Sequence, residues 1–330
     1  PTSGDGSIKN IGGKKKMAGF QQLKVTRELD AAGAVKIGLG YDLPGVDYYV
    51  DGTLGNDGHD GLGWGGDRAF ATIGQAMTKA AAYGASLGER RGRVRIFVAP
   101  GGYTEDVVTP LNTECPFGQL IAVNPTPTRS FGATYIVAST AVTTSLIVRA
   151  RGWLITGFEI GAVASNGCVW LDGSTANSSA QGTEISHCII GGWAVGTYGI
   201  DITGNGAPHS IVHHNHFDGI IGPAIKCSRS GTDQPRFWDV YKNHFVDNSS
   251  HINMNPRGFK ESWIHDNVFM EVGANRTASV QLDNTGGSAC AIGPGNFLSD
   301  TYDSTGGYVP GSNEDWYGNA SSAGFTTANP

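Results

Sequence analysis

Five short segments between Val169 and Leu282 repeat the same alternation of apolar and polar positions. In each, two apolar residues flank a middle residue, whose side chain points to the opposite face if the segment is a β-strand. Their first residues are separated by 31, 25, 27 and 28 positions. The segments are Val169-Trp170-Leu171, Ile200-Asp201-Ile202, Ile225-Lys226-Cys227, Ile252-Asn253-Met254 and Val280-Gln281-Leu282. The pattern predicts one strand of this kind in each copy of a structural repeat.

A second series of large apolar residues has a matching period. Its members are separated by 32, 27, 28, 24 and 28 positions and are Phe158, Ile190, Phe217, Phe245, Phe269 and Phe297. Three of them follow an asparagine by two positions, at Asn215, Asn243 and Asn267. We expect these asparagines to stack as a ladder of hydrogen-bonded amides, with the neighbouring His213, His214 and His216 outside. Two series in step indicate a solenoid, and the predicted fold is an all-β, right-handed parallel β-helix.

The chain before these series predicts a helix that covers the open end of the solenoid. Thr72 and Gln75 have the spacing of a capping box, and the residues after Thr72 place apolar side chains on one face. Such a helix shields exposed core and strand edges. We expect the β-helix domain to span residues 41–300. The tail 301–330, rich in Gly, Ser, Asn and aromatic residues, should cap the other end or contact another subunit.

Residues 1–40 differ in character from the rest of the chain. They are rich in glycine and contain the basic run Lys14-Lys15-Lys16. A glycine-rich tail of this kind is ordered when its own oligomer or a larger assembly holds it. We therefore expect residues 1–40 to be an anchoring and assembly segment.

The order of motifs after Tyr48 resembles the entry into the pectin-lyase-like right-handed β-helix superfamily. The resemblance rests on Tyr48-Tyr49-Val50-Asp51-Gly52, the loop from Gly55 to Gly61, and Ile96-Phe97-Val98-Ala99-Pro100-Gly101-Gly102-Tyr103-Thr104-Glu105. It covers Tyr48 to about Asp300 and implies the fold. The superfamily includes polysaccharide lyases, hydrolases, epimerases, bacteriophage tailspikes and inert virion appendages, so the resemblance alone does not select a function.

Composition and charge narrow the possibilities. Glycine accounts for 50 of 330 residues and charged residues for 16%, as expected of a chain with many tight turns and few amphipathic helices. The net charge of −6 gives no support for nucleic-acid binding. No apolar run approaches the roughly 18 residues of a membrane span. The first residues lack a secretory signal pattern and the five cysteines form no CxxC pair, so we expect reduced thiols and assembly in a host cytoplasm.

The middle residues of the five strands form the strongest candidate site. Their outward column consists of Trp170, Asp201, Lys226, Asn253 and Gln281. A neighbouring column, one position beyond each strand's second apolar residue, consists of Asp172, Thr203, Ser228, Asn255 and Asp283. With strands about 4.8 Å apart these columns predict a continuous polar strip with one aromatic, suited to an extended polysaccharide. The alternative is an ordinary solvated face in which Asp201 and Lys226 form a weak surface ion pair.

Cleavage of a glycan by this strip is a second possibility. Asp172 and Asp201 on adjacent turns could supply the two carboxyl groups of a glycoside hydrolase. Val169-Trp170-Leu171-Asp172 resembles a pectate-lyase motif, but Gly173 replaces the histidine of that motif. Around Gln234-Pro235-Arg236, Asp233 and Trp238 stand where the resemblance would require arginines. The match therefore supports the fold and not an activity.

Two possible metal sites have simpler explanations. The loop from Asn56 to Asp67 has a faint likeness to a calcium loop but is expected to be a turn. The cluster His213-His214-Asn215-His216 has no third ligand in the local sequence. We expect no metal and no cofactor.

The sequence thus favours a structural role. We expect a bacteriophage virion protein (a head or tail spike, fibre or decoration appendage) that forms a homotrimer, contacts other virion proteins through residues 1–40 and binds host surface polysaccharide. The alternative is a polysaccharide-depolymerising lyase or hydrolase of the tailspike kind.

Overall fold

The structure is a computed structural model, and it divides the chain into two compact units, Pro1–Leu43 and Pro44–Pro330. It describes residues 45–87, 93–123, 134–163, 166–175, 177–191, 196–204, 206–228, 235–254, 258–270, 290–298 and 318–319 in full. For several further strands it describes the backbone only. In the first unit these are β1 (Arg27–Leu29) and β2 (Val35–Ile37), which form an antiparallel hairpin. The rest of the predicted anchoring segment lies outside the described residues.

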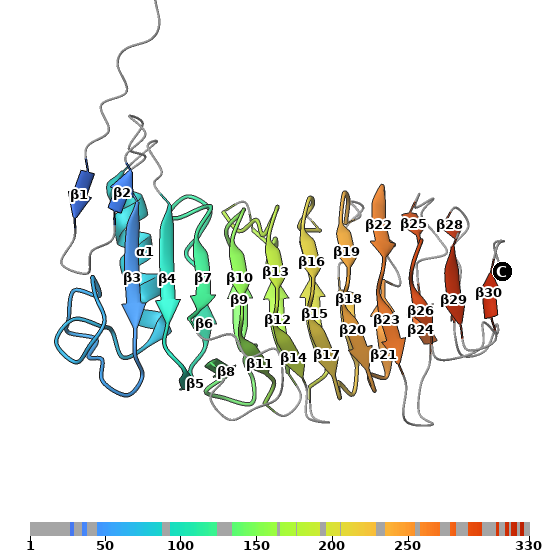
Figure 1. Cartoon of the computed structure of the whole chain (residues 1–330), viewed down its shortest axis with the longest axis horizontal. Helices are drawn as coiled ribbons and strands as arrows, with labels where there is room; N and C mark the ends of the chain where they lie inside the picture. Colours follow the sequence, from blue (N-terminus) through green and yellow to red (C-terminus); the bar gives the residue numbers. More distant parts are fainter. Residues whose placement is uncertain are drawn as a thin grey trace, which may run out of the picture. The chain divides into compact units, whose positions relative to one another are not determined.

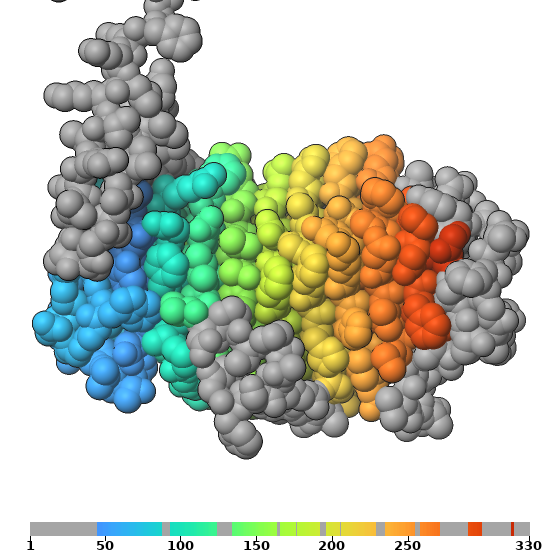
Figure 2. Space-filling view, in the orientation of Figure 1, coloured from blue at the N-terminus to red at the C-terminus, as the bar shows by residue number. Residues whose placement is uncertain are grey.

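The second unit is a right-handed parallel β-helix built from three sheets (Figure 1). Each turn of the chain contributes one strand to each sheet, from β4-β5-β6 to β25-β26-β27. In the space-filling view the successive turns follow one another as bands in chain order (Figure 2). The predicted fold class is confirmed.

Sheet I begins the unit. Its strands are β3 (Val46–Val50), β4 (Val94–Val98), β7 (Gln119–Ala122), β10 (Leu154–Thr156), β13 (Glu184–Ser186), β16 (Ile211–His213), β19 (Asp239–Tyr241), β22 (Ser262–His265), β25 (Cys290–Ile292) and β28 (Glu314–Trp316). Sheet II contains β5 (Gly101–Thr104), β8 (Thr134–Val137), β11 (Glu159–Gly161), β14 (Ile189–Gly191), β17 (His216–Asp218), β20 (His244–Val246), β23 (Val268–Met270), β26 (Phe297–Leu298), β29 (Asn319–Ser321) and β30 (Gly324–Thr326). Sheet III contains β6 (Val107–Val108), β9 (Leu146–Val148), β12 (Gly167–Leu171), β15 (Tyr198–Ile202), β18 (Pro223–Cys227), β21 (Ser250–Asn253), β24 (Ala278–Gln281) and β27 (Tyr308–Val309).

The core is made of columns of identical or similar side chains. On sheet III the first residues of the five predicted strands pair in unbroken register, from Val169 to Val280. On sheet II, Phe217, Phe245 and Phe269 stack with ring centroids 4.7 and 4.9 Å apart. Stacking of like residues along the axis removes apolar surface from water on every turn, which is the main stabilising contribution.

The sheet II series was predicted wrongly at both ends. Ile160, and not Phe158, pairs with Ile190, and Leu298, and not Phe297, pairs with Phe269. Phe297 points outward and is 40% exposed. Phe158 is buried, but it lies at the bend before β11.

Left-handed residues bracket most strands of sheet I. A residue with positive φ precedes the strand by one or two positions, and a second one follows five residues after the first. Glycine occupies some of these positions, but they also include His209 and His214, Phe237 and Lys242, and Glu261 and Asp266. A positive φ is costly for residues other than glycine, so the regular hydrogen bonding of the turns must hold these residues in place.

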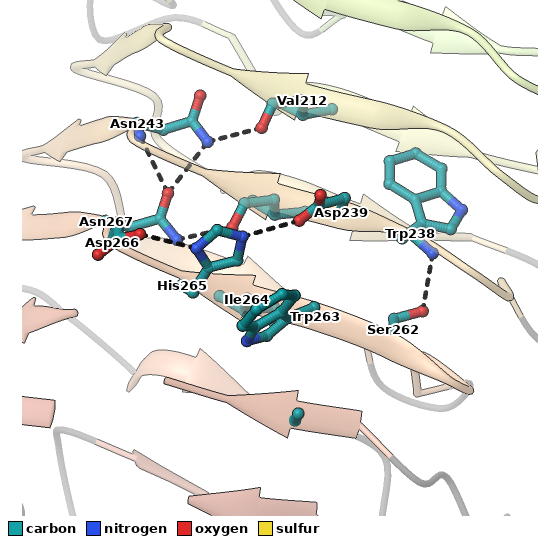
Figure 3. Close-up of polar contacts among 12 residues, drawn as sticks. Val212, Trp238, Asp239, Asn243, Ser262, Trp263, Ile264, His265, Asp266 and Asn267 are labelled. Atoms are coloured by element: carbon teal, nitrogen blue, oxygen red, sulfur yellow. Dashed lines mark hydrogen bonds and ion pairs between the residues drawn. The ribbon is translucent and has the colours of Figure 1, made fainter. Parts of the chain in front are cut away.

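Buried asparagines follow the second left-handed residue in five successive turns. They are Asn215, Asn243, Asn267, Asn296 and Asn319. The Oδ1 atom of Asn243 accepts the backbone N–H and the side-chain N–H of Asn215, both at 3.0 Å. The side-chain amide of Asn243 donates to Asn267 and to the carbonyl of Val212 (Figure 3). The predicted ladder is confirmed, and it extends two turns further than the sequence motif indicated.

The predicted capping helix is α1 (Ile73–Ser86), and its first turn is well capped. The hydroxyl of Thr72 accepts the N–H of Gln75 at 3.1 Å. The carboxylate of Glu105 accepts the N–H groups of Ile73 and Gly74 at 2.8 and 2.7 Å. Burial raises the pKa of Glu105, while these two hydrogen bonds act in the opposite direction. The positive end of the helix dipole also stabilises a carboxylate at this position.

The buried face of α1 takes the place of missing strands. In the described chain between β3 and β4 there are no strands of sheets II and III, and α1 packs there against β3, β4 and β6. Its buried residues are Ile73, Ala76, Met77, Ala80 and Gly84. The helix thus closes the core at the first turn, as the amphipathic pattern predicts. No helix in the described part of the chain has the length and apolarity to cross a membrane.

The loop before α1 is a turn, as expected. The side chain of Asn56 accepts the N–H of Gly58 at 2.8 Å, and Asp60 pairs with Arg68 at 2.9 Å. Asp57 accepts the N–H groups of the two residues before α1 and the hydroxyl of Thr72. The side chain of Asp57 therefore holds the loop against the start of the helix.

The three sheets continue past residue 300. Strands β27, β28 and β29 pair in parallel with the strands of the preceding turn, and β30 then pairs antiparallel with β29. The final antiparallel pair ends the parallel stacking of sheet II. The sequence predicts that the tail 301–330 caps the solenoid or contacts another subunit. The rest of this tail lies outside the described residues.

All five cysteines are buried, and none of them forms a disulfide. Cys227 points inward on sheet III, as predicted. Burial raises the pKa of Cys115, Cys168 and Cys188 to about 12. These thiols are therefore protonated at neutral pH and pack as small apolar groups.

Replacing an interior member of the ladder tests its contribution to stability. We expect Asn243→Ala to lower the free energy of unfolding by about 3 kcal/mol, because the buried N–H groups of Asn215 lose their acceptor. Urea unfolding followed by circular dichroism measures the change. The exposed Asn177→Ala is the control and should change stability by less than about 0.5 kcal/mol. Equal effects of the two substitutions would contradict a structural role of the ladder.

Candidate functional site

The predicted outward column of sheet III is in register. Trp170 pairs with Asp201, Asp201 with Lys226, Lys226 with Asn253, and Asn253 with Gln281. In the neighbouring column, Asp172, Thr203 and Ser228 continue the backbone ladder beyond their strands. Asn255 and Asp283 lie outside the described residues, and only the backbone of Gln281 is described. The structure thus brings together Trp170, Asp201, Lys226 and Asn253 on four successive strands.

Trp170 is held in a fixed position at the start of this column. Its indole N–H donates to the hydroxyl oxygen of Thr203 at 2.7 Å, on the next turn. The Thr203 hydroxyl in turn lies 3.4 Å from the carbonyl of Leu171, to which it donates. The indole is half-buried, so part of it remains open to a ligand. A ring already held in place loses little conformational entropy when a ligand packs against it.

Asp201 is more shielded than predicted. Its in-register neighbours are the large side chains of Trp170 and Lys226, and only 7% of the residue is exposed. Lys226 Nζ lies 3.5 Å from one carboxylate oxygen, and the N–H of Ser228 donates to the other at 3.1 Å. The ion pair of the alternative interpretation is thus present, but its aspartate is buried and not solvated. The alternation pattern shows the direction of a side chain and not the size of its neighbours.

Burial of Asp201 shifts its titration. Loss of hydration raises the pKa of this carboxyl group above its ordinary value, and the charge of Lys226 and the bonds to Ser228 and Lys226 act in the opposite direction. Lys226 is also held from its other side, with Nζ 4.3 Å from the ring centroid of Tyr198. The Tyr198 hydroxyl forms a 2.6 Å hydrogen bond with Thr144. The column is thus a connected polar network and not a set of independent surface groups.

The two carboxylates proposed for catalysis are not arranged as an open pair. Asp172 is 6% exposed, and its Oδ1 accepts the N–H of Ser174 at 2.8 Å, which closes the turn after β12. A hydrolase needs both carboxyl groups in reach of the scissile bond. This geometry favours binding over hydrolysis.

The outer face of sheet I carries an array that the sequence interpretation missed. The residues two positions before Asn215, Asn243 and Asn267 point outward, which places His213, Tyr241 and His265 in one column. Their rings stack with centroids 4.9 and 5.1 Å apart and interplanar angles of 2° and 6°. Counting back from the Asn motif would have revealed the column.

Histidines at the start of this array contact one another and a glutamate. His213 Nε2 lies 3.0 Å from Glu184, and its Nδ1 lies 2.7 Å from Nδ1 of His214. Partial burial, followed by the charges of His213, His187 and Lys242, lowers the pKa of His214. Among the described residues no group of three or more His, Cys, Asp or Glu side chains is arranged to hold a metal ion.

Comparison with known proteins adds information on the fold. No protein-family model matches the chain, and no curated protein matches it. Among solved structures, Escherichia coli YbhC has a TM-score of 0.53 at 10% sequence identity, over 92% of each chain. A rice weevil pectin methyl esterase gives 0.48 at 12% identity, over 77% of this chain and 87% of the other. The Dettilon tailspike protein gives 0.31 at 14%, over 83% and 65%.

The likeness is one of fold. At 10% identity the YbhC structure supports the β-helix architecture and nothing finer, and the other two scores are too low to carry an argument. Function must therefore be argued from the side chains.

The raised pKa of Asp201 predicts a specific pH dependence of stability. The folded state holds this proton more firmly than the unfolded state, so its contribution to stability falls as pH rises from about 3.9 through the folded pKa. Asp201→Asn removes this contribution. We expect the wild-type protein to lose stability relative to the variant over this interval, measured by urea unfolding at a series of pH values.

A second variant tests the cause of the shift. Lys226 lowers the pKa of Asp201, so Lys226→Met should raise that pKa and extend the interval to higher pH. A wild-type protein that gains stability relative to Asp201→Asn as pH rises from about 4 would contradict this assignment.

Proposed function

We propose that this β-helix is a structural appendage of a bacteriophage virion (a head or tail spike, fibre or decoration protein) that binds extended host polysaccharide along sheet III. The observation that carries the proposal is the in-register column Trp170, Asp201, Lys226 and Asn253. Its members stand one strand apart, so a polymer lying along the solenoid axis meets a new side chain about every 4.8 Å.

The chemistry of the column suits a saccharide chain. The partly open indole of Trp170 can pack on the C–H face of a sugar, and the amide of Asn253 can exchange hydrogen bonds with hydroxyl groups. The charges of Asp201 and Lys226 compensate each other. The strip therefore has no strong preference for a charged ligand, and neutral surface polysaccharides are the class that it fits best.

Removing the aromatic ring tests the binding site. We expect Trp170→Ala to weaken binding of a neutral bacterial surface polysaccharide by roughly three- to tenfold, the usual contribution of an aromatic contact. The matched control is Trp64→Ala, since Trp64 is also partly exposed (43%) but lies in the loop before α1. Titration calorimetry with a panel of soluble polysaccharides measures the affinities. Equal losses in both variants, or no binding to any member of the panel, would contradict the proposal.

The assembly part of the proposal concerns residues 1–40. We propose that this segment anchors a homotrimer to other virion proteins. Light scattering should give a mass near three times 34.5 kDa for the full chain, and deletion of residues 1–40 should disrupt this association. A monomer in both cases would contradict the trimeric appendage while leaving the binding test unaffected.

A second candidate function is depolymerisation of the bound glycan by a lyase or hydrolase. The burial of Asp201 favours it, because loss of hydration raises the pKa of this carboxyl group, and a carboxyl general acid needs a pKa above its ordinary value. The samples used for calorimetry can be assayed for new reducing ends and for unsaturated products. Cleavage that Asp201→Asn abolishes would establish the enzyme, whereas intact polymer with retained binding would support the structural role.

A further inference from the structure

Four side chains on the outer face of sheet I form a compact group at the end of the aromatic column. Asp239 of β19 pairs in register with Trp263 of β22, and His265 and Asp266 follow on the same strand and bend. His265 lies between the carboxylates, with Nε2 3.1 Å from Asp239 and Nδ1 2.8 Å from Asp266 (Figure 3). The group belongs to a different sheet from the proposed polysaccharide strip.

The indole of Trp263 is fixed but partly open. Its ring centroid lies 4.2 Å from that of His265 at an angle of 35°, and its N–H donates to the carbonyl of Gly293 on the next turn. Gly293 has no side chain, so the indole can extend over that turn and end the stack formed by His213, Tyr241 and His265. The residue is 42% exposed, which leaves apolar ring surface for a ligand.

The two carboxylates keep acceptor capacity toward solvent. The side chains of Asp239 and Asp266 are 38% and 46% exposed, and in the described contacts each uses one oxygen to bind His265. Two carboxylates with one imidazole leave a net negative charge whether the imidazole is neutral or protonated. Lys242 and Lys260 are the nearest lysines along the chain, and neither forms an ion pair with these carboxylates in the described part of the structure.

This combination selects a ligand by its chemistry. A partly open indole attracts C–H groups and cations, and two exposed carboxylates attract a cation with N–H and O–H donors. An amino sugar with a free ammonium group supplies all of these on one ring. A uronate is negatively charged and would be repelled by the two carboxylates. An N-acetylated sugar lacks the ammonium group.

We propose that Trp263, His265, Asp239 and Asp266 form a second saccharide site that takes a glycosamine unit with a free amine. The indole packs on the sugar ring and the two carboxylates bind the ammonium and hydroxyl groups. His265 is a positioning residue, because it holds both carboxylates in place beside the indole.

Titration of the full-length protein with three soluble probes tests this site. The probes are a glucosamine hexamer, its fully N-acetylated counterpart and a galacturonate hexamer. We expect the glucosamine hexamer to bind at least about tenfold more tightly than either of the others at low salt, and to lose affinity as salt screens the carboxylates. Equal affinity for the glucosamine and N-acetylglucosamine hexamers, or no binding of the glucosamine hexamer, would overturn the proposal.

Variants locate the binding. Trp263→Ala and Asp266→Asn should each weaken glucosamine hexamer binding by roughly three- to tenfold. Asp247→Asn is the matched control and should have no effect, since Asp247 is an exposed aspartate with φ 55°, close to the 53° of Asp266, but follows β20 of sheet II. Trp263→Phe keeps an aromatic ring and should retain more affinity than Trp263→Ala, which excludes misfolding as the cause.

The sheet III variant separates this proposal from the function proposed above. Trp170→Ala should leave glucosamine hexamer binding unchanged. Loss of binding in Trp170→Ala but not in Trp263→Ala would place the hexamer on sheet III and overturn the sheet I site. Failure of the neutral polysaccharides to bind sheet III would leave the sheet I result untouched.

Discussion

The buried asparagine ladder is the constraint that sets the geometry of the described turns around it. Each interior amide accepts two N–H groups from the asparagine of the preceding turn and donates to a carbonyl of that turn and to the next asparagine. All its polar atoms are thereby satisfied by groups at one fixed place on each neighbouring turn. A buried donor or acceptor that lost its partner in this ladder would cost about 1–3 kcal/mol. The turn from Ile292 to Asn296 has one residue more than the turns before it, and its asparagine still occupies the ladder. The same bend needs a left-handed residue before each asparagine, which explains why His214, Lys242 and Asp266 adopt that conformation.

The periodicity that satisfies the interior also aligns the exterior. Because successive turns share one register, the residues two positions before Asn215, Asn243 and Asn267 fall in one outward column. Where these residues are aromatic, they stack on one another, so their faces are used within the stack and only its end offers a ring surface. On sheet III the corresponding residues differ from turn to turn, and their contacts are an indole bond, an ion pair and a cation–π contact. Both faces are fixed before a ligand arrives, which reduces the entropy cost of binding.

Much of the fold could be predicted from the sequence, because each copy of the repeat can be aligned with the next and its apolar positions compared. The Val169 series is correct throughout, since strict alternation leaves only one register with the apolar residues inside. The Phe series fails at its ends because Phe158 and Phe297 belong to other positions of the repeat. Asn296 belongs to the ladder, and recognising it would have shown that Leu298, two residues later, points inward.

The candidate sites were less predictable than the fold. Alternation gives the direction of Asp201, but its burial depends on the bulk of Trp170 and Lys226 on the adjacent turns, which no local pattern shows. Asp172 was expected beside the strip, but its carboxylate closes a turn. The group of Trp263, His265, Asp239 and Asp266 was not predicted, because its members come from two turns. Their proximity depends on the register between β19 and β22, which becomes apparent only once the asparagine ladder is aligned.

The two outer faces differ in charge in a way that bears on specificity. On sheet III the negative charge of Asp201 is compensated by Lys226 at 3.5 Å, so the site proposed there would discriminate mainly through shape and hydrogen bonds. On sheet I two carboxylates share one imidazole, so the site proposed there would discriminate through charge, and salt would weaken its binding more. The outward residues of both columns make no contribution to the amide ladder or to the stacked phenylalanines. Substitutions there can therefore change the chemistry of either proposed site without changing the turn geometry on which both sites depend.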